Sequence, residues 1–207
     1  MPESYREIIG SKTELVVWKI TESEAELEEG LSFSPKAHER LSQRKSEIHR
    51  KGYLAIRQLL RLLGIPPEIH QYDSRGAPYL TDGRFISISH SQDCAAVVVS
   101  STPVGLDLEH RRVKIKRISS RFLHPSELEH LGHLDQVAYL TQIWTAKEAL
   151  YKVLRKPGIH FSSQLKIHPF KPGAPTGTGT VLDQEKTQQY TLYYRYFEGY
   201  CLSLAIQ

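Results

Sequence analysis

The chain has 207 residues, of which 40% are hydrophobic and 24% charged, the balance of an ordinary globular protein. Its formal charge of +4 is too small to indicate nucleic-acid binding, but it suits anionic small ligands or an acidic protein partner. Two cysteines indicate neither a disulfide framework nor a zinc site, as expected in a reducing cytoplasm. The charged N-terminal residues lack the apolar core of a signal peptide, and no apolar run reaches the ~20 residues of a membrane span.

The first half of the chain combines strand patterns with one long helical pattern. Ser34 and Pro35 are residue types that favour a helix N-cap and first turn, and Gly64 favours a helix end. We therefore expect one helix over 34–63, preceded by a short helix that Thr21 caps. Its N-terminal half is basic, which indicates either a solvated face or a phosphate-binding rim. Strands are expected at 15–20, 85–91 and 95–99, with a loop and a short strand over 73–80.

The second half repeats this composition of elements without a tandem sequence repeat. A long helix is expected at 137–155 and a shorter one around 126–133. Strands are expected at 104–109 and near 164–169, 179–183, 190–196 and 199–206. We predict an α+β fold of two pseudo-symmetric lobes, 1–103 and 104–207, each with a long helix packed on a mainly antiparallel sheet. The ligand cleft is expected between the lobes.

A pair of carboxylates is the most informative local pattern. Asp107 and Glu109 are two residues apart on the expected strand, so their side chains share one face with Gly105. At ~5 Å and an effective dielectric constant of ~20, their repulsion costs roughly 3 kcal/mol. A hard cation such as Mg²⁺ would offset that cost, and it commonly completes its shell with substrate phosphates. A phosphate-handling enzyme is therefore the first hypothesis, with Gly105 leaving room for the ligand.

The helix expected at 137–155 carries further charged residues. Glu148 and Lys152 are four residues apart and share a helix face. They form either an ordinary surface salt bridge or part of the same site as the strand carboxylates. Lys147 falls on the apolar stripe, where a lysine needs a reason such as reaching past the core to an anion.

Two other segments allow both a structural and a functional interpretation. Ser126 is expected to cap a helix, with Glu127 in the first turn and Glu129 at N3. Glu127 therefore either complements the helix dipole or serves as a general base. Ser89 and His90 either end a strand with turn hydrogen bonds or donate to a phosphate. The chain contains no Walker A, Gly-x-Gly-x-x-Gly, His-Glu-x-x-His or Gly-x-Ser-x-Gly motif.

Taken in order, these segments resemble the 4'-phosphopantetheinyl transferases of the Sfp type. The resemblance runs from about residue 40 to residue 152 and includes the basic helix and Phe122 with Glu127. The other matching motifs are Gly76-x-Pro78, Ser89-His90-Ser91, Val104-Gly105-x-Asp107-x-Glu109 and Trp144-x-x-Lys147-Glu148-Ala149-x-x-Lys152. No motif is matched in 1–35 or 160–207.

The resemblance implies roles for individual residues. Mg²⁺ ligands would be Asp107, Glu109 and Glu148. Contacts to coenzyme A are expected from Arg44, Arg75, Ser89, His90, Lys147 and Lys152. Catalytic roles are expected for Glu127, as general base, and for Lys152. One departure is that Ala77 replaces the lysine of the family's Gly-Lys-Pro loop, so Arg75 is the proposed substitute.

The implied activity is Mg²⁺-dependent transfer of the 4'-phosphopantetheine arm of coenzyme A to a serine of an acyl or peptidyl carrier protein. The alternatives are a non-catalytic homologue that binds coenzyme A or a carrier, and another Mg²⁺-dependent phosphotransferase or phosphodiesterase. The expected partners are coenzyme A and an acidic apo carrier protein, with no nucleic acid and no membrane. We expect a cytoplasmic monomer.

Overall fold

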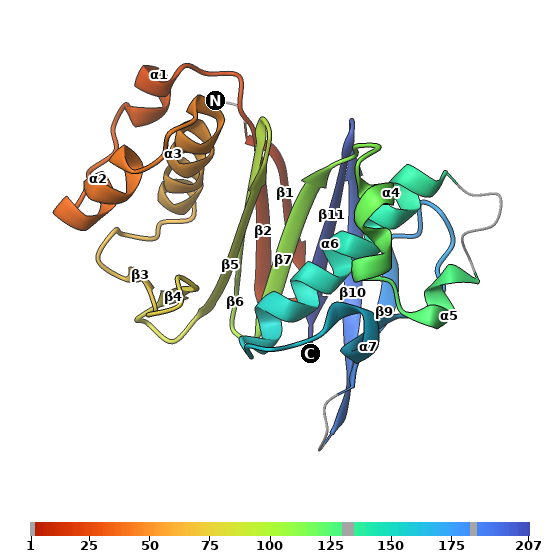
Figure 1. Cartoon of the computed structure of the whole chain (residues 1–207). Helices are drawn as coiled ribbons and strands as arrows, with labels where there is room; N and C mark the ends of the chain where they lie inside the picture. Colours follow the sequence, from red (N-terminus) through yellow and green to blue (C-terminus); the bar gives the residue numbers. More distant parts are fainter. Residues whose placement is uncertain (1–2, 130–134, 183–185) are drawn as a thin grey trace. The chain divides into compact units, whose positions relative to one another are not determined.

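The computed structural model describes residues 3–129, 135–182 and 186–207. The chain divides into two compact units, Met1–Thr102 and Pro103–Gln207. Each unit combines helices with an antiparallel sheet (Figure 1). The predicted α+β class and the pairing of one long helix with one sheet in each half are confirmed.

The first unit is built on a four-stranded antiparallel sheet in the order β1-β2-β6-β5. The strands are β1 (Glu3–Ile9), β2 (Thr13–Lys19), β5 (Phe85–Ser91) and β6 (Cys94–Ser100). The longest helix of this unit, α3 (Glu47–Leu62), supplies Leu54 and Leu59 to the core that it shares with Val97 of β6. Sequence patterns missed β1, because this edge strand pairs only with β2 and its exposed positions include the apolar Ile8 while the charged Glu7 is partly buried.

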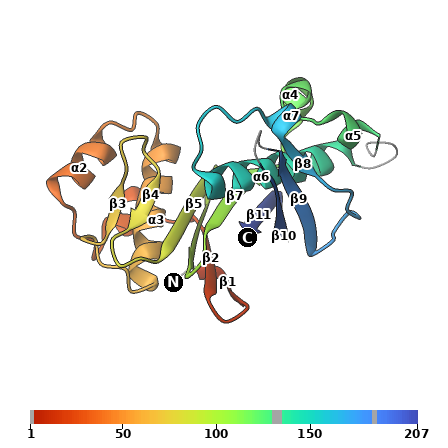
Figure 2. The same cartoon turned by 90° about the horizontal axis from the view of Figure 1, so that it is seen from below.

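The helices of the first unit correct two predictions. The single helix expected over 34–63 is two helices, α2 (Pro35–Ser42) and α3. The Ser46 hydroxyl accepts the His49 N–H and starts a new helix, so the chain turns at 43–46. The short helix α1 (Glu24–Glu28) is capped by Ser23 with Glu26 rather than by Thr21. A hairpin of β3 (His70–Tyr72) and β4 (Pro78–Leu80) lies beside α2 and α3 (Figure 2).

The second unit is built on a five-stranded antiparallel sheet in the order β7-β11-β10-β9-β8. The strands are β7 (Val104–His110), β8 (Leu165–Ile167), β9 (Thr176–Leu182), β10 (Thr187–Phe197) and β11 (Tyr200–Ile206). Helix α6 (Gln136–Leu154) lies across one face of this sheet (Figure 1). The shorter helices are α4 (Ile115–Ile118), η1 (Ser119–Arg121), α5 (Pro125–Leu128) and α7 (Phe161–Gln164). Among these, α5 takes the place of the helix expected around 126–133, and 130–133 lie outside the described residues.

Gly105 allows α6 to approach β7 closely. A Cβ atom at this position would lie 2.0 Å from the Ala149 carbonyl oxygen and 2.7 Å from the Val153 nitrogen. Both are backbone atoms of α6, so the space beside Gly105 is filled by the helix. The prediction that Gly105 leaves room for a ligand is therefore wrong. Its function is to let a helix backbone pack directly on a strand backbone.

Both cysteines, Cys94 and Cys201, are free and buried, and burial raises the pKa of each thiol to about 12. Such thiols stay protonated at neutral pH and are unreactive. Within the described residues, no helix combines the length and the apolar character that crossing a membrane requires.

We expect Gly105→Ala to destabilise the second unit by about 3 kcal/mol or more, because its methyl group would displace the backbone of α6. Urea denaturation of the full chain measures this loss. Gly179→Ala on β9 is a matched control, since its Cβ would meet only side-chain methyl groups of Leu150, Leu192 and Ile167. Equal stability of the two variants would contradict the packing role of Gly105.

Candidate functional site

The acidic residues of β7 lie on the face of the sheet that α6 covers. Gly105 contacts α6 on this face, and Asp107 and Glu109 follow it at alternate positions of the strand. The Lys152 ammonium on α6 lies 2.8 Å from Asp107 Oδ1 and 2.9 Å from the Leu106 carbonyl oxygen. Helix packing thus brings residues about forty positions apart into one polar cluster.

A buried hydrogen-bond network holds α6 against β11, the strand next to β7. The Gln142 side-chain amide donates to Ser203 Oγ at 2.6 Å, and the Thr145 hydroxyl lies 2.8 Å from the same oxygen. Ser203 is paired in register with Asp107 across the two strands. The network therefore fixes the helix next to the acidic residues. Sequence reasoning did not identify it, because isolated Gln, Thr and Ser residues have no distinctive pattern.

Glu148 completes the negative charge of this cluster. Burial, followed by repulsion from Asp107, raises the pKa of Glu148 to about 7, although Lys152 opposes the shift. Glu109 also raises this pKa, by a smaller contribution. Glu148 and Glu109 are partly exposed, whereas the Asp107 side chain is buried and bound by Lys152. We define Asp107, Glu109, Glu148 and Lys152 as the acidic cluster.

The chemistry of the acidic cluster fits a hard divalent cation, because its acidic ligands are all oxygens and they repel one another. Among the described residues, however, no three side chains of the His, Cys, Asp and Glu types are grouped closely enough to hold a metal ion. In this structure the positive charge next to Asp107 is the Lys152 ammonium group. Mg²⁺ binding therefore stays a prediction.

Glu127 and Lys147 form a buried ion pair, which differs from the general base and the anion contact expected from the sequence. Lys147 Nζ lies 2.8 Å from Glu127 Oε2, and neither side chain is more than 1% exposed. The Glu127 carboxylate also accepts the His124 N–H at one oxygen and the Ile167 N–H at the other. Lys147 also donates to the Phe122, Phe161 and Leu165 carbonyl oxygens.

These contacts leave neither group available to a ligand. Burial lowers the pKa of Lys147, and the Glu127 carboxylate opposes that shift. A general base must be accessible to its substrate, and the Glu127 side chain is only 1% exposed in this structure. The predicted capping box of Ser126 with Glu129 is wrong in its residues, because the N-cap is His124 and the box partner at N3 is Glu127. Lys147 joins α6 to α5, α7 and β8 instead of binding an anion.

A separate group of polar residues lies around His90 in the first unit. Ser89 and His90 lie near the end of β5, as predicted, and His90 is exposed. The His90 ring packs against Gly52 of α3, where a Cβ atom would lie 2.8 Å from Nδ1. The His49 ring lies 6.1 Å from the His90 ring, edge to face. Sequence reasoning missed His49 and Gly52, although a glycine inside a long helix is itself a signal of close packing.

The two predicted arginines lie in different surroundings. Arg44 lies between α2 and α3, with its guanidinium carbon 4.2 Å from the centre of the Tyr53 ring and Nη1 bound to the Arg40 carbonyl oxygen. Arg75 is exposed in the loop between β3 and β4, where its N–H donates to Asp73 Oδ1. Arg75 is therefore accessible to an anion, whereas Arg44 is partly buried against an aromatic ring.

We expect Lys147→Met to lower the free energy of unfolding by about 3–5 kcal/mol, because it leaves the Glu127 carboxylate buried without its charged partner. The double variant Lys147→Met with Glu127→Met should recover much of this loss, since apolar residues can replace a buried ion pair. Urea denaturation of both variants measures the coupling. A Lys147→Met protein of unchanged stability would rule out this structural role.

Two family models match the chain. One, described as the 4'-phosphopantetheinyl transferase superfamily, matches residues 103–205, and the other, described as the 4'-phosphopantetheinyl transferase N-terminal domain, matches residues 36–100. The chain is 29% identical to 4'-phosphopantetheinyl transferase gsp of Aneurinibacillus migulanus over 163 residues, 74% of this chain and 67% of that protein. It is 34% identical to a 4'-phosphopantetheinyl transferase of Bacillus subtilis over 110 residues, 50% of this chain and 49% of that protein. The chain is thus a member of the 4'-phosphopantetheinyl transferase superfamily.

Proposed function

We propose that this enzyme transfers the 4'-phosphopantetheine arm of coenzyme A to a serine of an apo acyl or peptidyl carrier protein. The acidic cluster carries the proposal, because it joins three carboxylates and a lysine within a member of this superfamily. The released product is 3',5'-adenosine bisphosphate. The carrier serine oxygen forms a bond to the β-phosphorus of coenzyme A, and the bond from that phosphorus to the bridging oxygen breaks.

Within the acidic cluster, Lys152 would stabilise negative charge on the pyrophosphate. Its ammonium is held by Asp107 Oδ1 and the Leu106 carbonyl oxygen, and its side chain is 29% exposed, so the positive charge lies next to solvent. Mg²⁺ held by Asp107, Glu109 and Glu148 would supply further stabilisation of the same charge.

The hydroxyl proton of the carrier serine needs an acceptor. The fold leaves few carboxylates that could take this role. Glu127 is sealed between α5, α6 and β8. Glu109 and Glu148 are the partly exposed carboxylates of the acidic cluster, whereas Asp107 is bound by Lys152. We therefore assign proton acceptance to Glu109 or Glu148, directly or through a bound water.

Residues of the first unit would bind the phosphates of coenzyme A. His90 presents an exposed imidazole, Ser89 a neighbouring hydroxyl, and Arg75 an exposed guanidinium in the loop where the family has a lysine. The Arg75 contact would compensate for Ala77. An acidic carrier protein fits the formal charge of +4, which favours electrostatic steering of a weak encounter.

Mass spectrometry of an apo carrier incubated with coenzyme A, Mg²⁺ and the enzyme tests the proposed activity. We expect addition of the phosphopantetheine arm and a loss of roughly 100-fold or more in rate for Asp107→Ala, which removes a carboxylate at the centre of the acidic cluster. Asp82→Ala is the matched control, because Asp82 lies in an exposed turn and pairs with Arg84. Cleavage of coenzyme A without modification of any carrier would instead identify a hydrolase.

Gly52→Ala tests the phosphate-binding assignment of His90. The added methyl group would push the imidazole away from α3, so we expect coenzyme A affinity to fall roughly tenfold. Helix propensity favours alanine by ~1 kcal/mol, so the fold should be retained. Calorimetric titration measures the affinity, with Lys51→Ala as the control because it removes a charge on the same turn. Unchanged coenzyme A affinity in both Gly52→Ala and His90→Ala would show that the assignment is wrong.

A further inference from the structure

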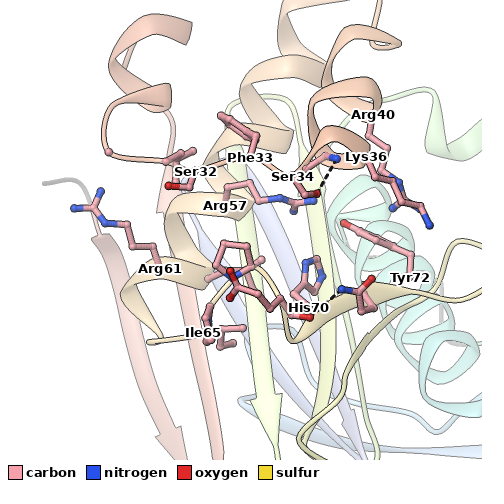
Figure 3. Close-up of a pocket in the computed structure, with 18 of the residues that line it drawn as sticks. Ser32, Phe33, Ser34, Lys36, Arg40, Arg57, Arg61, Ile65, His70 and Tyr72 are labelled. Atoms are coloured by element: carbon pink, nitrogen blue, oxygen red, sulfur yellow. Dashed lines mark hydrogen bonds between the residues drawn. The ribbon is translucent and has the colours of Figure 1, made fainter.

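The first unit contains a cavity of about 720 Å³ that the proposed reaction does not use. It lies between α2, the C-terminal half of α3 and β3 (Figure 3). Its volume falls within the ~300–1,000 Å³ that is typical of small-molecule sites. Its apolar lining residues include Leu31, Phe33, Leu60, Ile65 and Pro66. The cavity is therefore large enough and apolar enough to enclose part of an organic ligand.

The charged lining of this cavity is mainly positive. Lys36, Arg40, Arg57 and Arg61 line it, against the single carboxylate of Glu68. Figure 3 shows Arg57 near the centre of the cavity, with Arg40 and Arg61 at opposite ends. A ligand that enters this cavity would therefore be most favourable if it were an anion.

Two of these arginines stack on tyrosine rings rather than pairing with carboxylates. The Arg40 guanidinium carbon lies 4.0 Å from the centre of the Tyr72 ring, and that of Arg57 lies 4.1 Å from the centre of the Tyr53 ring. Within the described part of the chain, no carboxylate lies at ion-pair distance from Arg40 or Arg57. Stacking orients the two planar groups and leaves their charges uncompensated.

Two buried polar atoms in the cavity lining lack a hydrogen-bond partner among the described residues. They are Arg57 Nη1 and His70 Nε2, and His70 is only 8% exposed. Burial, reinforced by Arg57 and then Arg40, lowers the pKa of His70 to about 4, so the ring is neutral at pH 7. A buried polar atom without a partner is unfavourable, and a ligand oxygen that bonded to it would remove that cost.

We propose that this cavity binds a small organic phosphate whose body is apolar or aromatic. The phosphate would bind the guanidinium groups of Arg40 and Arg57, whose forked donors match phosphate oxygens. Its body would contact Phe33, Leu60 and Ile65. Lys36, exposed on α2, would add a further positive charge at the opening.

The site is separate from the proposed phosphate contacts at His90. Neither Ser89 nor His90 lines the cavity. On α3, Gly52 faces His90, whereas the helix face around Arg57, Leu60 and Arg61 borders the cavity. At ~100° per residue these two faces are turned roughly 130° from each other around the helix. Occupation of the cavity therefore does not require displacement of coenzyme A.

Titration of the full chain with 1-naphthyl phosphate, followed by calorimetry and by the fluorescence of the probe, tests the site. We expect saturable binding at one site, with affinity reduced roughly tenfold or more in Arg57→Gln. Lys36→Gln should weaken binding several-fold, and its exposed position keeps the fold intact. Arg84→Gln is the matched control, because Arg84 pairs with Asp82 outside the cavity and should bind the probe normally.

Inorganic phosphate and coenzyme A test two parts of the proposal separately: the contact with the apolar body of the ligand, and the independence of this site from coenzyme A. Inorganic phosphate should bind more weakly than 1-naphthyl phosphate, because it lacks the apolar body, and equal affinities would overturn that part. Binding of the probe should persist in saturating coenzyme A, and full displacement by coenzyme A would overturn the separate site. Absence of saturable binding, or equal affinity of the parent and both pocket variants, would overturn the anion-binding assignment.

Discussion

The close approach of α6 to β7 is the constraint on which the second unit depends. A strand residue with a Cβ at position 105 would collide with the Ala149 carbonyl, so the contact requires glycine. Because helix and strand backbones touch there, Asp107 lies under α6 and reaches Lys152. The same packing places Asp107 and Glu148 close enough for their charges to interact. A packing requirement thus determines the electrostatics of the acidic cluster.

The Glu127–Lys147 pair shows how burial decides the role of a charged residue. The two residues have the types that catalysis uses, and they belong to the segments that resemble the family. Yet backbone N–H and carbonyl groups satisfy both side chains, and the pair joins α6 to three neighbouring elements. Its buried charges are stable only while every partner is present. We regard this pair as the support that holds α6 in position for the acidic cluster.

Basic residues of the first unit have different structural surroundings, and their positions in the sequence do not predict which surroundings each one has. Arg50 binds Glu24 through two nitrogens and joins α1 to α3. Arg44 and Arg57 both stack on the Tyr53 ring, with guanidinium carbons 4.2 Å and 4.1 Å from its centre. Arg75 remains exposed in its loop. Basic residues that look alike in the sequence therefore supply a structural ion pair, a cationic stack beside a cavity and an exposed charge in a loop.

The sequence alone determined what local rules control. Alternation predicted most strands, helical periodicity predicted α6, and the Asp107-x-Glu109 spacing predicted two carboxylates on one face. The sequence also predicted that Asp107, Glu109, Glu148 and Lys152 belong to one site, because their motifs resemble those that form one site in this family. Only the tertiary structure decided that the helix expected over 34–63 is broken by a cap at Ser46, that Gly105 contacts a helix, and that Glu127 and Lys147 are sealed in the core. Periodicity identifies which side of an element is buried, but the partner that covers it is chosen by packing between segments far apart in the chain.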